Sequence, residues 1–149
     1  MATRRPPRFS RRQSVVSLLL QNLEVRSRFP SFRFRKIGGV GVWRGAFAPR
    51  PSSPDFQVEV RYRLGGIPCV HLLRPALRPD APHVYKGGAL CLYWPPDALW
   101  LPDKFLATSI FPLIWSWLGY YELWLETGQW LGPESPHRSS SRLSEEDAP

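Results

Sequence analysis

The sequence predicts an α+β domain in which a helix precedes a four-stranded antiparallel meander and a long helix follows it. Helical spacing of apolar residues near the N-terminus, short alternating runs between turn residues, and renewed helical spacing after residue 103 support this prediction. The 149 residues, 43% of them hydrophobic, suffice for one domain with its own core. We expect a basic flexible arm at residues 1–9, the folded domain at 10–137 and a polar disordered tail at 138–149.

The first helix is predicted to begin near Ser10 and to end at Phe29-Pro30. Its apolar side chains recur at the spacing of one helical face, namely Val15, Leu18, Leu19 and Leu23. This pattern is typical of an amphipathic helix.

The strands are predicted from short runs separated by turn residues, and residues 32–36 and 56–63 alternate between apolar and polar side chains. The predicted strands cover residues 32–36, 40–47, 56–63 and 69–73. Gly38-Gly39 and Gly65-Gly66 are predicted turns, and residues 49–54 form a proline-bearing loop. Consecutive strands joined this way favour an antiparallel meander.

The second half of the chain begins with an irregular, aromatic-rich segment at residues 75–100. Such segments are ordered by packing, and loops of this kind often hold functional sites. A long helix is then predicted, with Asp103 as its cap and Gly128 as its stop. Pro112 is expected to kink this helix or split it in two.

Charge and cysteine content limit the possible environments. The net charge is +8, and an arginine-rich N-terminus is compatible with an anionic partner or with the codon bias of a GC-rich genome. Arg11-Arg12 and the apolar run at 15–20 are similar to a twin-arginine signal, but the run stops at Gln21 without a cleavage site. The apolar run at 105–118 is too short for a bilayer, and two cysteines make no disulfide scaffold. We therefore expect a soluble cytoplasmic protein without a membrane partner.

Two sequence segments carry a family resemblance. Residues 82–93 read Pro-His-Val-Tyr-Lys-Gly-Gly-Ala-Leu-Cys-Leu-Tyr, and residues 117–130 read Trp-Leu-Gly-Tyr-Tyr-Glu-Leu-Trp-Leu-Glu-Thr-Gly-Gln-Trp. The first resembles the active-site stretch of ubiquitin-conjugating enzymes, with Ala81-Pro82-His83 in place of their His-Pro-Asn and Leu90-Cys91-Leu92 as the cysteine step. Together the segments resemble the bacterial ubiquitin-conjugating-enzyme-like proteins of CBASS anti-phage defence operons. The resemblance covers roughly residues 29–137.

This resemblance implies a UBC-like fold and a cysteine-dependent transferase that needs no cofactor. Cys91 would form a thioester with the C-terminus of a protein partner and pass the acyl group to an amine. The partner implied for this subgroup is a cGAS-like nucleotidyltransferase, so the reaction would regulate anti-phage signalling. An activating enzyme, if the reaction needs one, would be a separate protein.

The residue types suit this chemistry. A thioester preserves the energy of an activated carboxyl group, and the cysteine thiolate is strongly nucleophilic. Attack by an amine creates an oxyanion that needs a prepositioned donor, and His83 stands where the family has asparagine. His83 could be a donor, a base or a residue that holds the loop. Asp97 or Asp103 could orient or deprotonate the incoming amine, and the sequence does not distinguish them.

Other functions remain as alternatives. The chain could be an inactive UBC-fold binding module, a basic nucleic-acid binder that uses its N-terminal arginines, or a hydrolase built on Cys91 and His83. The spacing of Cys69 and His71 lacks a second close ligand pair, so no zinc site is expected. Gly87-Gly88 lacks the context of a phosphate-binding loop, so no ATP site is expected.

Overall fold

The computed structural model describes residues 14–133 as one sheet with helices before and after it. The expected arm at 1–9, the helix start at Ser10, and the tail at 138–149 lie outside the described residues. The elements are α1 (Leu18–Arg28), β1 (Arg33–Ile37), β2 (Val40–Phe47), β3 (Phe56–Arg63), β4 (Cys69–Arg74), the 3-10 helix η1 (Pro95–Asp97), α2 (Leu106–Ser109) and α3 (Phe111–Thr127). This order confirms the predicted α+β class.

The sheet is an antiparallel meander in the order β1-β2-β3-β4. Gly38 and Gly39 join β1 to β2 with φ of 55° and 79°, the left-handed conformation that tight hairpin turns favour. In the β2–β3 register Trp43 faces Val60 and Gly45 faces Val58. In β3 the inward positions alternate with polar ones, as the sequence pattern predicted.

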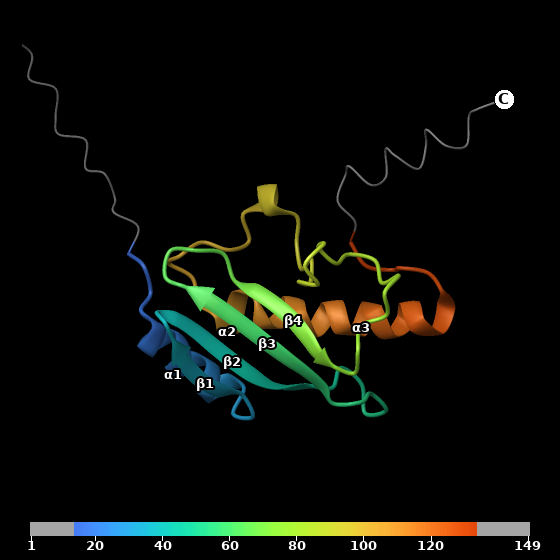
Figure 1. Cartoon of the computed structure of the whole chain (residues 1–149), viewed down its shortest axis with the longest axis horizontal. Helices are drawn as coiled ribbons and strands as arrows, with labels where there is room; N and C mark the ends of the chain where they lie inside the picture. Colours follow the sequence, from blue (N-terminus) through green and yellow to red (C-terminus); the bar gives the residue numbers. More distant parts are fainter. Residues whose placement is uncertain (1–13, 134–149) are drawn as a thin grey trace, which may run out of the picture.

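The core lies between one face of the sheet and the helices, and Figure 1 shows α3 running behind the strands. Its largest fully buried side chains include Trp43, Tyr62 and Phe111. On the opposite sheet face, buried Glu59 accepts hydrogen bonds from Arg44 and Arg61. Burial raises the pKa of Glu59, but these two arginines outweigh it and hold the pKa below 4.5.

The first helix differs from its prediction in start and in orientation. Residues 14–17 are not helical, and Ser17 caps the helix by accepting a hydrogen bond from the Leu20 amide. Leu19 and Leu23 are 68% and 50% exposed, so the predicted apolar face is wrong at both positions. The buried stripe instead contains Gln21, whose polar side chain the apolar pattern could not assign to the core.

Gln21 also explains where α2 begins. Its side-chain nitrogen donates to the Lys104 carbonyl at 2.8 Å, and its oxygen accepts from the Leu106 amide at 2.9 Å. Because a side chain from α1 satisfies this helix start, the predicted cap at Asp103 is wrong. The predicted split near Pro112 is confirmed, since α2 ends at Ser109 and α3 begins at Phe111. Gly128 ends α3 with a φ of 72°, as expected.

Candidate active site around Cys91

A short hairpin presents Cys91 at the edge of the sheet. Val84 and Leu90 form an isolated antiparallel bridge, and the Tyr85 amide donates to the Ala89 carbonyl at 2.8 Å. The turn closes through Gly88, which adopts a φ of 87°. The Leu90 amide then donates to the Val70 carbonyl of β4 at 2.8 Å. The hairpin is thereby anchored on the sheet one residue before the cysteine.

Cys91 is a free thiol that is neither sealed in the core nor fully exposed. Its amide donates to the His83 carbonyl at 2.9 Å, and its sulfur lies 4.0 Å from the Tyr93 carbonyl oxygen. Leu90, directly before it, is buried in the core. The backbone therefore holds Cys91 firmly while its side chain reaches the surface.

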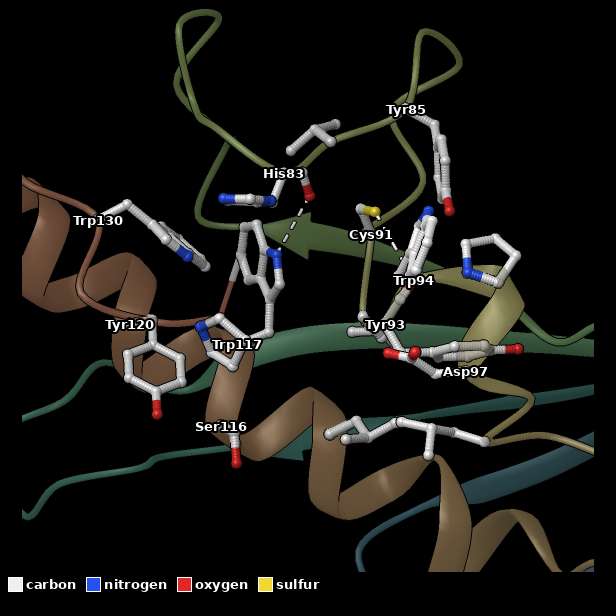
Figure 2. Close-up of a pocket in the computed structure, with 16 residues that line it drawn as sticks. His83, Tyr85, Cys91, Tyr93, Trp94, Asp97, Ser116, Trp117, Tyr120 and Trp130 are labelled. Carbon is white, nitrogen blue, oxygen red and sulfur yellow. Dashed lines mark hydrogen bonds between the residues drawn. The ribbon is translucent and has the colours of Figure 1, made fainter. Parts of the chain in front are cut away.

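His83 supports the hairpin through its backbone. Its carbonyl accepts hydrogen bonds from the Cys91 amide and, at 3.2 Å, from the indole nitrogen of Trp117 in α3. The residue is 7% exposed and has a φ of 55°. Its ring centroid lies 4.8 Å from that of Trp130, and Figure 2 shows the imidazole turned toward Trp130 and away from the Cys91 sulfur. A role of the imidazole as donor or base stays a prediction.

Tyr85 is a site residue that sequence reasoning missed. The interaction of its hydroxyl with Cys91 is the main reason that the pKa of Tyr85 rises to about 12, with burial adding to the shift. Figure 2 shows the phenol beside the hairpin, with its hydroxyl at the level of the sulfur. The Pro-His-Val-Tyr motif contained this signal, since it places the tyrosine two residues after His83.

The two candidate acids lie differently. Asp97, in η1, lines the pocket beside Cys91. Asp103 is exposed in the segment before α2 and is not among the lining residues. The structure thus brings Asp97, but not Asp103, into the same pocket as the cysteine. Neither observation tests a role in catalysis.

The pocket has a volume of about 580 Å³ and is formed by the hairpin, η1, α3 and the segment after α3 (Figure 2). Most of its wall is aromatic or aliphatic. Burial raises the pKa of Tyr93, one of the lining residues. Within residues 14–133, no group of three or more His, Cys, Asp or Glu side chains could hold a metal ion. No helix in that same range is long and apolar enough to cross a bilayer.

A helix, a four-stranded meander, a cysteine on a hairpin beside the sheet and a helix behind it together define a protein of the ubiquitin-conjugating-enzyme-like class. Residues 21–138 match the family described as Type II CBASS E2 protein, in which E2 denotes the ubiquitin-conjugating type. The chain belongs to this family. A search among curated proteins gave no match.

Proposed function

We propose that this protein carries an acyl group as a thioester on Cys91 and transfers it to an amine. The observation that supports the proposal best is the position of the thiol. Cys91 is partly exposed at the wall of an apolar pocket, on a hairpin fixed by backbone hydrogen bonds to His83 and β4. Such preorganisation is what a nucleophile requires.

The proposed reaction has two balanced steps. The Cys91 thiolate first attacks the carbonyl carbon of an activated C-terminus; the new C–S bond forms as the bond to the activating group breaks. An amine then attacks the thioester and loses a proton, and the Cys91 thiolate leaves with the electrons of the C–S bond. The product is an amide or isopeptide, and no oxidant or reductant is consumed.

The neighbouring groups have proposed roles in these steps. The Tyr85 hydroxyl, whose pKa is raised mainly by its interaction with Cys91, is proposed as a donor to the sulfur that attacks in the first step and leaves in the second. Asp97 is the better placed of the two acids to attract a protonated amine, because it shares the pocket with the thiol. His83 is proposed to position the hairpin through its carbonyl, with a role of its ring as donor or base retained as a second proposal.

The proposed partner is a protein of the CBASS pathway with an activated C-terminus, specifically a cGAS-like nucleotidyltransferase. Membership of the CBASS E2 family supports a partner within this pathway. The activated C-terminus would come from a separate activating enzyme or from another acyl donor. Modification of the partner would regulate the anti-phage signal.

The two cysteines allow a matched test of the proposal. Cys91→Ala should abolish a thiol-sensitive adduct between this protein and its partner after coexpression, as read by non-reducing electrophoresis. Cys69→Ala is the control, because Cys69 is also a free, partly buried cysteine, but it lies on β4 and does not line the pocket. An adduct that survives Cys91→Ala would contradict the proposal and favour a binding module.

A further inference from the structure

The pocket beside Cys91 has an unusually aromatic wall for a site proposed to hold a peptide C-terminus. Six of its lining residues are aromatic, namely Tyr85, Tyr93, Trp94, Trp117, Tyr120 and Trp130. Aliphatic side chains from the hairpin, the η1 segment and α3 complete the wall, namely Val84, Leu92, Leu99 and Leu113. The pocket therefore offers apolar contact immediately next to the thiol.

Packing keeps the deep part of the wall in place. Trp117 is 3% exposed and stacks on Tyr121 with ring centroids 5.2 Å apart. Tyr120 packs over Gly132, where an added Cβ would come within 2.7 Å of its ring. Because Trp117 is buried and each of the two rings packs against a neighbour, this part of the wall is held in place. A volume of about 580 Å³ lies within the range of pockets that bind small apolar molecules.

The charge of the wall also favours a neutral, apolar occupant. The lining residues include one carboxylate, Asp97, and no lysine or arginine. An acidic side chain entering the pocket would lose hydration without gaining a cationic partner. A neutral apolar side chain would instead exchange water for aromatic and aliphatic contacts.

From the volume, the rigidity and the charge we infer that this pocket binds a bulky apolar side chain from the last two residues of the acyl donor, and so selects donors that do not end in Gly-Gly. The inference rests on the proposed thioester function. Glycine has no side chain to fill the pocket, whereas a leucine or phenylalanine next to the thioester carbonyl can reach it. Hydrophobic pockets of this kind discriminate by about tenfold or more.

Synthetic peptide thioesters test the inference without an activating enzyme. Peptides of equal length, activated as mercaptoethanesulfonate thioesters, would end in Gly-Gly, Gly-Leu, Leu-Gly, Gly-Phe, Phe-Gly or Glu-Gly. In each reaction the Cys91 thiolate attacks the carbonyl carbon, a C–S bond to Cys91 forms, and mercaptoethanesulfonate leaves and takes a proton from water. Mass spectrometry of the full chain measures the loading rate at Cys91.

We expect at least one apolar position to load about tenfold faster than Gly-Gly, and Glu-Gly to load no faster than Gly-Gly. Equal rates for the apolar and the Gly-Gly peptides, with adducts formed at Cys91, would overturn the inference and leave the proposed function standing. If no peptide loads Cys91, the thioester function fails and the inference fails with it.

Variants of the wall link the preference to the pocket. Ser116 is exposed on α3 and lines the pocket, so Ser116→Trp should fill it and reduce the preference to less than about threefold. Leu99, 39% exposed, can be shortened by Leu99→Ala with little risk to folding, and this change should also weaken the preference. Thr108→Trp is the matched control, because Thr108 is exposed but does not line the pocket.

The acceptor amine is the competing occupant of the pocket. Suppose that Ser116→Trp leaves the peptide preference unchanged but slows aminolysis of the loaded thioester by hexylamine more than by ammonia. The pocket would then hold the acceptor, and the inference would be overturned.

Discussion

At the scale of single residues, the contact between Cys91 and Tyr85 is the feature that sets this cysteine apart from Cys69. The sulfur of Cys69 lies 3.8 Å from the His71 ring nitrogen on β4, whereas Cys91 lies at the wall of a pocket and interacts with the phenol of Tyr85 strongly enough to raise the pKa of that phenol. A hydroxyl next to the sulfur can donate to it whenever the sulfur is charged. The two residues thus place a nucleophile and a possible hydrogen-bond donor on the same hairpin.

The contact predicts a coupled titration. Tyr85 should ionise near pH 12, and Cys91→Ala should move its pKa toward the usual 10.0, because the interaction with Cys91 is the main cause of the shift. Carbon NMR of ring-labelled tyrosine can follow the five tyrosines separately, and Tyr85→Phe assigns the signal. Since the pKa is raised on folding, the stability from this contact is present below pH 10 and is lost as pH approaches about 12. Equal midpoints with and without Cys91 would refute the contact.

The ring of His83 and the left-handed backbone conformation of this residue lead to a separate prediction about stability. His83→Ala should lower the free energy of unfolding by about 2 kcal/mol, because alanine loses the packing on Trp130 and is strained at a φ of 55°. His83→Asn should cost about 1 kcal/mol less, since asparagine tolerates this conformation. Urea denaturation measures both. An alanine variant as stable as the native chain would show that neither the packing of the ring on Trp130 nor the preference of the residue for this backbone conformation stabilises the fold.

At the scale of elements, the strands and the C-terminal ends of the helices were predictable, and the helix starts were not. Residues 56–63 alternate throughout and residues 40–47 lie between two turn segments, so β3 and β2 were predicted with their observed limits. The start of α2 depends on Gln21, whose side-chain amide joins α1 to that helix across 85 positions of sequence. No local sequence pattern could predict this contact, because an isolated glutamine is usually a surface residue.

The tightest backbone approach in the sheet yields a prediction for β2. Gly45→Ala would bring a Cβ within 2.5 Å of the Phe32 ring and 2.9 Å of its Cα. These distances are shorter than van der Waals contact, so Phe32 or the backbone of β2 would have to move. We expect a loss of about 2 kcal/mol in the free energy of unfolding, within the range of overpacked cores. Gly87→Ala is the control, because an added Cβ there meets nothing within 4 Å. Equal stability of the two variants would mean that Phe32 does not pack over Gly45.

At the scale of the whole molecule, the site depends on parts far apart in the sequence. β4 holds the hairpin through Leu90, α3 holds it through Trp117, and η1 closes the pocket with Asp97. The sequence motif around Cys91 identified the candidate nucleophile and its family. It did not reveal that the His83 ring would pack against Trp130, because that contact depends on the path of the segment after α3.

The most direct test of the central claim is to locate the linkage on the native chain. The protein would be isolated with its partner, digested without reductant at mildly acidic pH, and mapped by tandem mass spectrometry before and after dithiothreitol. The account predicts the C-terminal residues of the partner on the sulfur of Cys91, released by dithiothreitol at neutral pH. A linkage confined to Cys69 or to a lysine of this chain, with Cys91 unmodified, would contradict it.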